Sequence, residues 1–525
     1  MTLTGQGPVT IAKLRHRVSA SIQVADIDGD GADEVLVAGR SLQAFSAGLK
    51  RKRLRFPRGR RPFASTPAAV PGFGSAAVFV GCDDGRLYAN TVEAAARGGV
   101  FVETGLDIYS SPVVFEHNGE RLITFGSDDE RIYCVRQDGT SLEGFPVSCG
   151  AFVSATPAVG DFDGDGAPEI VVGDWYGELH ALRLDGKEPP KFPFRLGQPT
   201  WSSVALADIN GDGGLEAVVA DRYLHAVSSD ADEVAGFPQL LGSYTVGSPI
   251  VVDGLGDGKA TIVVASDKLY AVNGNGRPIA GFPVDLGAYQ WASPLAVSKA
   301  LSSELMFVAA GWDGKVWAIS AGGEREELLA TGGPIFSTPA VVATNKGACS
   351  LVAASWDGRI YSRPLDGAKI DARSWPRFSL TSGNRRTVNQ KFLGPGGEPA
   401  NTATPPAGMA PAIASAQLDP APARHRVPTF IHYRGKGLEA FERATVFYKV
   451  AGEEREHPTP VYLAGGEALA LFQPLGVGRR VNYHFEGITF DGEEIRVPAQ
   501  GEEGYLVKRL GPLPIGRFVA AMEGH

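Results

Sequence analysis

Short apolar runs recur along the first 365 residues, and each is bounded by glycine, aspartate or proline. In the clearest stretch, the run 154–160 is followed by a loop rich in aspartate and glycine at 161–168 and then by the β-branched run 169–173. Short β-branched runs between turn residues are typical of strands and lack the period of an amphipathic helix. The pattern therefore predicts an all-β protein built from antiparallel hairpins.

The same pattern occurs eight times, as one anchor position in each copy makes visible. The anchors are 45 residues apart, except for one interval of 47, and are Ile22, Pro67, Pro112, Pro157, Val204, Pro249, Pro294 and Pro339. Three or four short strands in 45 residues correspond to one propeller blade. We therefore predict an eight-bladed β-propeller, with seven blades as the alternative. An open β-solenoid fits less well, because it does not need four strands in each repeat.

The propeller is expected to occupy residues 1–389, and its ring is closed either by residues 9–18 or by those after Trp375. A stretch rich in proline, alanine and glycine at 390–427 predicts a linker. Beyond it, alternating strands between Gly-Gly and Asp-Gly turns predict a small β-sandwich over 428–525. The expected strands are 445–450, 460–463, 469–472, 481–486 and 494–497.

The composition agrees with many tight turns, because 67 glycines and 36 prolines make up 103 of the 525 residues. A net charge of -9 argues against a protein that uses its whole surface to hold nucleic acid. The exception is Lys50–Arg61, with eight cations in twelve residues. We interpret it as a solvated connection between blades, with anionic glycan, acidic lipid or, least favoured, nucleic acid as alternative partners.

The patterns of membrane spans, signal peptides and cysteines do not indicate a functional site. No apolar run reaches the roughly 18 residues of a membrane span, and the N-terminus lacks the pattern of a signal peptide. The four cysteines do not form a disulfide framework or a CxxC metal site, so they predict buried thiols.

Three of the eight loops carry oxygen side chains at positions 1, 3 and 5 and a glutamate at position 9. With a backbone carbonyl at position 7, these oxygens can surround one hard cation, and so many anionic oxygens suit Ca²⁺ better than Mg²⁺. An EF-hand is excluded, because valine stands at position 12. The predicted ligands are Asp26, Asp28, Asp30, Ala32 and Glu34, then Asp161, Asp163, Asp165, Ala167 and Glu169, then Asp208, Asn210, Asp212, Gly214 and Glu216. A fourth loop, with Asp253 and Asp257, lacks positions 3 and 9 and is a doubtful site.

These loops, together with the 45-residue units, resemble the FG-GAP (VCBS-type) repeats of integrin α-subunit propellers and of many bacterial secreted proteins. The resemblance covers about residues 9–385. It implies Ca²⁺ between two strands of a blade, at about three sites. The run 481–492 looks like the late strands of immunoglobulin or fibronectin type III modules and implies a spacer or adhesion module. Because such calcium sites often work at about 10⁻⁴–10⁻³ M, they favour an extracellular or cell-surface location.

The third strand of most units carries an aromatic residue at one fixed place, namely Tyr88, Tyr133, Tyr270, Trp317 and Tyr361. In the first, fourth and fifth units this place holds Gln43, His180 and His225. Two histidines in neighbouring units are compatible with a metal or catalytic pair. Since the position packs within the repeat, we interpret them as core histidines with hydrogen-bond partners.

Aromatic residues also gather in the connections at the other end of the strands, which alternation places on the face opposite the acidic loops. Exposed rings stack on sugars or contact protein partners. The alternative is that each ring covers a blade interface. The candidate binding residues are Tyr109, Trp175, Trp201, Tyr244, Tyr289, Trp291, Trp312, Phe336 and Trp356.

No nucleophile elbow, HExxH, phosphate loop or dinucleotide fingerprint is found, and we assign no catalytic residue. The first hypothesis is a non-enzymatic, calcium-binding recognition or adhesion protein for a glycan or protein partner. The alternative is a carbohydrate-active enzyme, because an eight-bladed propeller with calcium is also similar to the rhamnogalacturonan lyases. An intracellular scaffold is the third possibility.

Overall fold

The computed structural model divides the chain into two compact units. The first comprises Met1–Leu196, Thr200–Gln239 and Thr245–Thr402, and the second comprises Gly197–Pro199, Leu240–Tyr244 and Ala403–His525. The structure describes residues 9–14, 18, 20–28, 30, 32–52, 56–70, 77–91, 98–253, 258–299, 305–343, 349–365, 368–369, 387–391, 412–419, 429–436, 441–450, 457–464, 467–472, 480–489, 494–497 and 503–506. Every regular element in these ranges is a strand, and they contain no helix that could cross a membrane.

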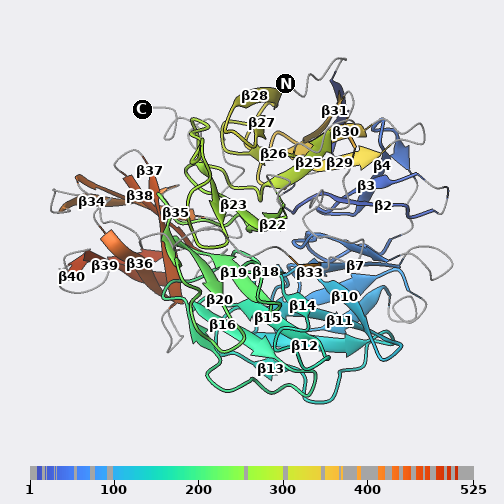
Figure 1. The fold of residues 1–525 in the computed structure, drawn as a ribbon, viewed down its shortest axis with the longest axis horizontal. Helices are drawn as coiled ribbons and strands as arrows, with labels where there is room; N and C mark the ends of the chain where they lie inside the picture. Colours follow the sequence, from blue (N-terminus) through green and yellow to red (C-terminus); the bar gives the residue numbers. More distant parts are fainter. Residues whose placement is uncertain are drawn as a thin grey trace. The chain divides into compact units, whose positions relative to one another are not determined.

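The first unit is an eight-bladed β-propeller, with one antiparallel sheet for each predicted repeat (Figure 1). Blade 1 consists of β2 (Gln23–Ala25), β3 (Glu34–Val37), β4 (Gln43–Ser46) and β5 (Arg51–Lys52). Blade 2 consists of β6 (Ala68–Val70), β7 (Ala77–Cys82), β8 (Arg86–Ala89) and β9 (Val100–Glu103). Blade 3 consists of β10 (Val113–His117), β11 (Glu120–Ser127), β12 (Arg131–Arg136) and β13 (Val147–Ser148). Blade 4 consists of β14 (Ala158–Gly160), β15 (Glu169–Gly173), β16 (Glu178–Leu182) and β17 (Phe194–Arg195).

The later blades keep the same order, with small additions. Blade 5 consists of β18 (Ala205–Asp208), β19 (Glu216–Ala220), β20 (Tyr223–Val227) and β21 (Gln239–Leu240), and β33 (Thr387–Lys391) runs parallel to β18. Blade 6 consists of β22 (Ile250–Val252), β23 (Thr261–Ala265) and β24 (Leu269–Asn273). Blade 7 consists of β25 (Leu295–Lys299), β26 (Leu305–Ala310), β27 (Lys315–Ser320) and β28 (Arg325–Ala330), with β32 (Ala368–Lys369) beside β25. Blade 8 consists of β29 (Ala340–Ala343), β30 (Cys349–Ser355), β31 (Arg359–Leu365) and β1 (Thr10–Lys13).

The N-terminal strand closes the ring. β1 pairs antiparallel with β31, from Thr10 opposite Ser362 to Lys13 opposite Arg359. One apolar cluster then joins Val24 and Val35 of blade 1 to side chains of blade 8. Of the two segments that the sequence left open, residues 9–18 therefore contain the closing strand. A closed ring of eight sheets also excludes the seven-bladed and solenoid alternatives.

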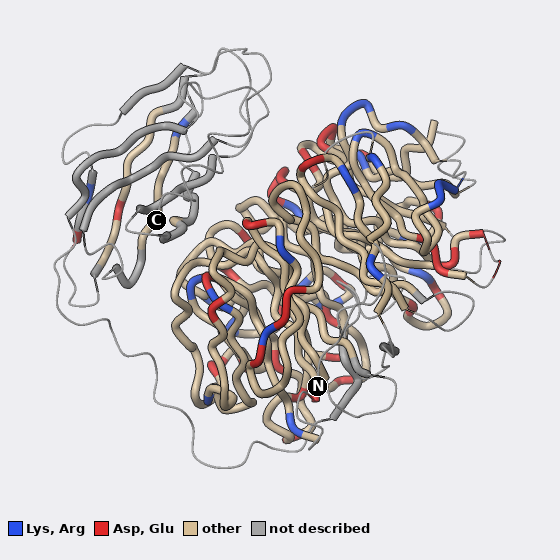
Figure 2. The backbone as a smooth tube through the Cα atoms, turned by 90° about the horizontal axis from the view of Figure 1, so that it is seen from above, with Lys and Arg blue, Asp and Glu red and all other residues tan. Residues whose placement is uncertain are grey.

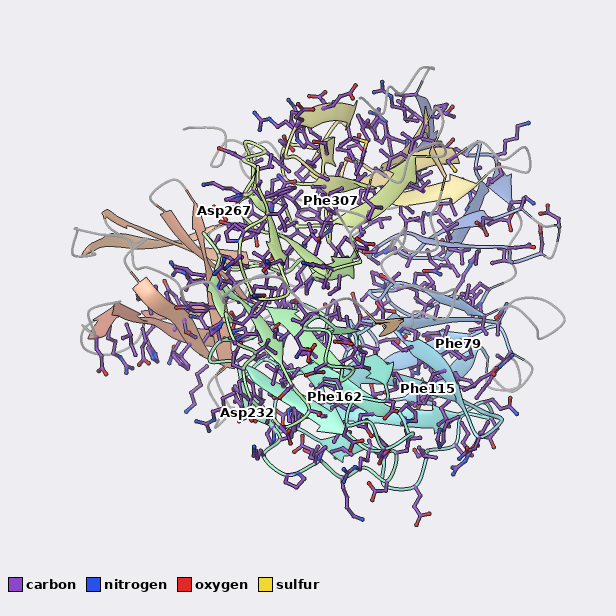
Figure 3. All side chains as sticks on the ribbon, in the orientation of Figure 1. Phe79, Phe115, Phe162, Asp232, Asp267 and Phe307 are labelled. Atoms are coloured by element: carbon purple, nitrogen blue, oxygen red, sulfur yellow. The ribbon has the colours of Figure 1, made fainter. Side chains whose placement is uncertain are left out.

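The strands are short and apolar because both faces of each blade are covered by neighbouring blades. Figure 3 labels four phenylalanines of this interior, Phe79 in blade 2, Phe115 in blade 3, Phe162 in blade 4 and Phe307 in blade 7, and all are buried. The four cysteines are free thiols, and all are buried except Cys149, which is half-buried.

A belt of hydrogen bonds joins the blades at their inner edge. In each blade, a buried serine or threonine comes directly before the anchor position. Its backbone N–H donates to the hydroxyl of the equivalent residue in the next blade, at 2.9–3.3 Å, in seven described steps. The belt residues are Ser21, Thr66, Ser111, Thr156, Ser203, Ser248, Ser293 and Thr338. The step from Thr338 to Ser21 spans the ring closure.

The second unit contains antiparallel strands that include all five predicted ones. They are β34 (Ala412–Asp419), β35 (Thr429–Lys436), β36 (Phe441–Val450), β37 (His457–Ala464), β38 (Glu467–Phe472), β39 (Arg480–Thr489), β40 (Glu494–Val497) and β41 (Glu503–Leu506). Because β37 pairs with both β36 and β38, all these strands are connected in one hydrogen-bonded sheet. The immunoglobulin or fibronectin type III likeness stays a prediction. The predicted linker, 390–427, includes β34 and the end of β33, and the rest of it lies outside the described residues.

Candidate functional site

The three predicted acidic loops occupy the same place in their blades. Each connects the first strand of its blade to the second, as β2 to β3, β14 to β15 and β18 to β19. Glycine is required at some turns, because Gly166 and Gly213 have positive φ values of 93° and 95°. Since the strands are antiparallel, the turns after β3, β15 and β19 lie at the opposite end of the sheets.

The glutamate at position 9 begins the second strand in all three blades and is buried with 0–2% exposure. One of its oxygens, Oε2, always accepts the backbone N–H of the second loop residue. The donors are Ile27 at 3.2 Å for Glu34, Phe162 at 2.8 Å for Glu169 and Ile209 at 2.8 Å for Glu216. The other oxygen, Oε1, has different surroundings in each blade.

In blade 4, Oε1 of Glu169 is buried and has no hydrogen-bond partner among the described residues. Carboxylate oxygens of Asp161 and Asp163 lie with an oxygen of Glu169 inside one group, all within 4.8 Å of one another. Asp161, Asp163 and Asp165 each accept one loop N–H group, as Asp165 does from Ala167 at 2.8 Å. An unpartnered buried oxygen beside two more carboxylates is a donor set suited to a hard cation.

In blade 5, an amide takes part in the loop. Asn210 Nδ2 donates to Asp212 at 2.9 Å and to Oε1 of Glu216 at 3.0 Å. Asp208 accepts the N–H groups of Gly211 at 2.7 Å and Gly213 at 3.0 Å. The amide at position 3 therefore links Asp212 to Glu216, and no lysine or arginine is bonded to this loop in the described structure.

In blade 1, a lysine enters the loop. Lys52 Nζ lies 2.9 Å from Asp28, 2.9 Å from Asp30 and 3.1 Å from Oε1 of Glu34. One ammonium thus contacts three of the five predicted ligand residues. The hydrogen bond from Lys52 also lowers the pKa of Asp30.

The electrostatics of the loops follow from burial next to other carboxylates. Burial raises the pKa of Glu169 to about 7, and the charges of Asp163 and Asp165 also raise it. Hydrogen bonds from the backbone N–H groups of Phe162 and Asp163 lower this pKa but do not outweigh burial. Burial also raises the pKa of Glu216 to about 8, with the charges of Asp212 and Asp208 adding to the effect. Ionised glutamates at these places are therefore costly without a cation.

Residues 161–219, which span both of these loops, match the family described as FG-GAP-like repeat. The match covers the acidic loops of blades 4 and 5, and the first loop of the chain has the same strand-loop-strand arrangement.

Comparison with solved structures finds similar chains at low identity. BBS1N in complex with ARL6DN, soaked with mercury, is 13% identical with a TM-score of 0.39, over 68% of this chain and 95% of that chain. The same complex soaked with lead is 12% identical with a TM-score of 0.40, over 67% of this chain and 94% of that chain. No curated protein matches the chain.

The doubtful fourth loop is only partly described. Oδ2 of Asp253 accepts the N–H of Gly258 at 3.1 Å. Asp257 lies outside the described residues. Among the described residues, the strand-loop-strand arrangement with an acidic loop is therefore found in blades 1, 4 and 5.

Aromatic rings form a connected arc at the strand ends opposite the FG-GAP-like loops. Trp175 and Trp201, from blades 4 and 5, have centroids 5.0 Å apart. Trp201 reaches Trp291 of blade 7 at 6.5 Å, although blade 6 lies between their blades in the chain. Since these blades are not neighbours, the contact places the rings close to the propeller axis.

The arc continues into blade 8 through edge-to-face pairs. Trp291 contacts Phe336 at 5.4 Å, and Phe336 contacts Trp356 at 5.0 Å. Trp312 contacts both Trp291 and Phe336, and Tyr289 contacts Trp291. Of these rings, Trp201, Trp291, Trp312, Phe336 and Trp356 are partly exposed.

The other predicted aromatic residues differ in exposure. Trp175 is 2% exposed and contacts Phe152, a ring that the sequence did not single out. Tyr109 is partly exposed. Tyr244 is fully buried, and its hydroxyl donates to the carbonyl of Pro199.

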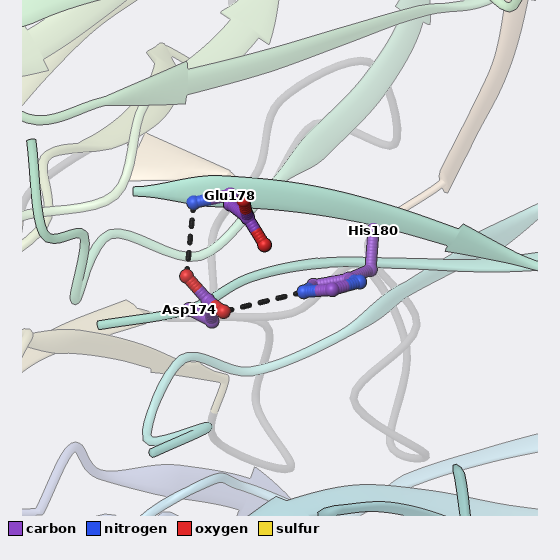
Figure 4. Close-up of side chains that lie close together, drawn as sticks. All are labelled: Asp174, Glu178 and His180. Atoms are coloured by element: carbon purple, nitrogen blue, oxygen red, sulfur yellow. Dashed lines mark hydrogen bonds and ion pairs between the residues drawn. The ribbon is translucent and has the colours of Figure 1, made fainter. Parts of the chain in front are cut away.

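His180 and His225, at the fixed place that holds an aromatic residue in most third strands, are both buried beside carboxylates. Figure 4 shows His180 with Asp174 and Glu178. His180 Nδ1 lies 2.7 Å from Glu188 and Nε2 lies 3.3 Å from Asp174. Burial lowers the pKa of His180, but the hydrogen bonds to Asp174 and Glu188 outweigh it and raise the pKa to about 9. Oxygens of Asp174 and Glu178 form a three-residue group with His180. The sequence predicted a partner for His180 but not which residues provide it.

Blade 5 repeats this arrangement. His225 Nδ1 lies 3.1 Å from Glu233, and Nε2 lies 3.5 Å from Asp221. Burial opposes the charged ring, but both carboxylates raise the pKa of His225 to about 10. In the tyrosine blades the corresponding ring donates to an aspartate, as Tyr133 does to Asp129 at 2.5 Å. The histidines therefore extend a ring-to-carboxylate contact of the repeat.

Acidic and basic residues are interspersed over the described propeller (Figure 2). Within the basic cluster Lys50–Arg61, Lys52 binds the first FG-GAP-like loop. Arg58 and Arg60 line a cavity of about 540 Å³ together with Arg86 of blade 2. Residues 53–55 of the cluster lie outside the described residues.

Proposed function

We propose that this chain is a non-enzymatic recognition protein that calcium stabilises and that binds a glycan or protein partner through its aromatic arc. The arc is the observation that carries the proposal. It gathers five partly exposed rings, Trp201, Trp291, Trp312, Phe336 and Trp356, at one mouth of the propeller. Tryptophan is enriched among the residues that dominate binding energy in interfaces, and ring faces stack on sugars.

The FG-GAP-like loops of blades 4 and 5 fit a calcium ion. The unpartnered Oε1 of Glu169 supports this, because a buried carboxylate oxygen without a donor is costly unless a cation binds it. The residues that would hold the ion are Asp161, Asp163, Asp165, Ala167 and Glu169 in blade 4, and Asp208, Asn210, Asp212, Gly214 and Glu216 in blade 5.

Calcium would supply charge neutralisation rather than catalysis. The raised pKa values of Glu169 and Glu216 indicate that each buried carboxylate favours its neutral form in the absence of a cation. An ion that binds the folded loop and not the unfolded chain stabilises the fold by mass action. The loops join the first two strands of their blades, so this stabilisation acts on the propeller and not directly on the aromatic arc.

The calcium concentration that such loops need supports a location outside the cell or on its surface. Extracellular calcium modules bind with dissociation constants of about 10⁻⁴–10⁻³ M. Proteinase digestion of intact producing cells, followed by immunoblotting of the chain, checks this part of the proposal. Protection of the chain until the cells are lysed would contradict it.

A glycan array and a polysaccharide-lyase assay, each with 2 mM CaCl₂ and with EDTA, test the recognition function. We expect the full chain to bind a subset of glycans without forming unsaturated products. Binding with turnover would replace the proposal by the carbohydrate-active enzyme. If the array shows no binding, crosslinking of the chain on intact cells, compared with a Trp291→Ala variant, tests the protein-partner form. Equal crosslinking of both proteins would contradict a role for the arc.

A further inference from the structure

Lys52 occupies a place where blades 3 to 6 carry an uncharged side chain and blade 7 carries Glu326. Lys52 pairs with Ala44 across the hairpin of β4 and β5. In blade 5 the N–H of Val234 donates to the carbonyl of Ala226, at 2.8 Å, in the equivalent hairpin. Counted from the same turn, the counterparts of Lys52 in blades 3, 4, 5 and 6 are Leu142, Pro189, Val234 and Ile279.

The hairpins of blades 1 and 5 are closed in the same way, so the comparison is between like backbones. Ser46 Oγ accepts the N–H of Lys50 at 3.2 Å, and Ser228 Oγ accepts the N–H of Asp232 at 3.3 Å. Lys52 lies two residues after Lys50, and Val234 lies two residues after Asp232. The two side chains therefore have the same register in their hairpins. A lysine at that position is the difference that brings a cation into the loop of blade 1.

The contacts of Lys52 match those expected of a bound cation. Its ammonium forms ion pairs with the side chains at loop positions 3, 5 and 9, namely Asp28, Asp30 and Glu34. In particular it forms an ion pair at 3.1 Å with Oε1 of Glu34, an oxygen that has no hydrogen-bond partner, whereas Oε1 of Glu169 has neither a hydrogen-bond nor an ion-pair partner among the described residues. The lysine side chain is 30% exposed, so it approaches the loop from the solvent side while Glu34 approaches from the core.

We propose that Lys52 is the resident cation of the first FG-GAP-like loop, so that calcium binds the loops of blades 4 and 5 but not that of blade 1. A calcium ion and an ammonium would repel each other at this distance and compete for the same oxygens. The inference rests on the proposed calcium binding of the other two loops. It also assigns one member of the basic cluster Lys50–Arg61 to a specific role.

Arg183 of blade 4 does not have the same effect. Its guanidinium bonds only Asp163 among the loop residues, at 2.6 Å, and its side chain is 43% exposed. Oε1 of Glu169 stays without a partner in its presence. An arginine that neutralises one carboxylate from outside leaves the other oxygens of the loop available to an ion.

Two reciprocal variants of the full chain test the inference, with Ca²⁺ itself as the probe. Lys52→Val copies the residue of blade 5, and Val234→Lys copies the residue of blade 1. Equilibrium dialysis against ⁴⁵Ca²⁺ at pH 7.5 measures the number of ions bound. We expect two ions for the unmodified chain, three for Lys52→Val and one for Val234→Lys.

Each other result has a definite meaning. Three ions on both the unmodified chain and Lys52→Val, or two on both, would overturn the role of Lys52 while leaving calcium binding intact. No bound ion on the unmodified chain would overturn the proposed calcium binding itself. As a second readout, we expect Lys52→Val to melt at a lower temperature than the unmodified chain in EDTA and to recover in CaCl₂. Should Lys52→Val not fold, Lys52→Met keeps the aliphatic stem of the lysine and tests the same charge.

Discussion

The indole rings of Trp175 and Trp201 lie 5.0 Å apart, with an interplanar angle of 40°, although they come from consecutive blades. The contact is the first of a series that reaches Trp291 and then blade 8. A ring that contacts rings of other blades is held in place by them. The partly exposed tryptophans are thereby preorganised, which lowers the entropy cost of binding a partner.

Trp291 is therefore expected to be the most important residue for binding, because it contacts four other rings of the arc. We expect Trp291→Ala to weaken binding to an array-positive oligosaccharide by at least about tenfold, or about 1.4 kcal/mol. Isothermal titration calorimetry with that oligosaccharide measures the change. The matched control is Trp317→Ala, since Trp317 packs against Lys315 and Arg325 outside the arc. Equal losses in both variants would contradict a binding role for the arc.

Replacing the two buried loop glutamates by glutamine should make the propeller insensitive to calcium. Glutamine copies the neutral form that burial favours at Glu169 and Glu216. We expect the double variant Glu169→Gln, Glu216→Gln to be more stable than the unmodified chain in EDTA at pH 8. In CaCl₂ the unmodified chain should gain about 2.7 kcal/mol for each site at 100 times its dissociation constant, and the variant should gain little.

Differential scanning calorimetry with EDTA and with CaCl₂ measures both effects. The comparison is made at one pH, so that other titrating groups contribute equally. A control variant, Glu103→Gln, removes an exposed carboxylate of blade 2 that bonds Arg86. An unmodified chain whose melting curve is the same in EDTA and in CaCl₂ would contradict calcium stabilisation.

The sequence was sufficient to predict the architecture, because the repeat is regular. Eight anchors at almost constant spacing predict eight blades, and the structure confirms them. It could not decide which terminus closes the ring, since residues 9–18 and the residues after Trp375 both offer strand-like segments. That choice depends on the pairing of β1 with β31, a contact between positions about 350 residues apart.

The chemistry of the loops was predicted only in part, for a related reason. The positions of Asp28 and Glu34 show a candidate cation loop, but the cation that reaches it comes from Lys52, on a later strand. Within a cluster of eight basic residues among twelve, composition does not distinguish Lys52 from its neighbours. The residues of the hydrogen-bonded belt, in contrast, can be recognised in the sequence, because serine or threonine precedes every anchor.

The buried histidines predict a loss of stability in alkaline solution. The pKa of His225 is raised to about 10 and that of His180 to about 9, whereas an unfolded histidine has a value near 6.5. The folded chain therefore holds protons that the unfolded chain has released. This stabilisation is complete below about pH 6.5 and is lost as the pH rises through about 9 to 10, at up to about 1.4 kcal/mol per pH unit for each group.

His225→Gln tests this pH dependence, because Gln43 occupies the same place in blade 1. The variant leaves Asp221 and Glu233 without a cationic partner in the core. We expect it to be less stable than the unmodified chain at pH 7 and nearly equal to it at pH 10. Urea denaturation followed by tryptophan fluorescence reports on the propeller, since all seven tryptophans lie before residue 376. A stability difference that is the same at both pH values would show that His225 is neutral in the fold.

The belt predicts a cost for removing a single hydroxyl at the inner edge. Ser203 Oγ accepts the N–H of Thr156 at 3.1 Å, and both residues are buried. Ser203→Ala should leave that N–H without a partner and lower the free energy of unfolding by about 1–3 kcal/mol. Ser203→Thr is the matched control, because threonine takes this place in blades 2, 4 and 8 and keeps the hydroxyl. Comparable losses in the alanine and threonine variants would attribute the effect to packing and not to the hydrogen bond.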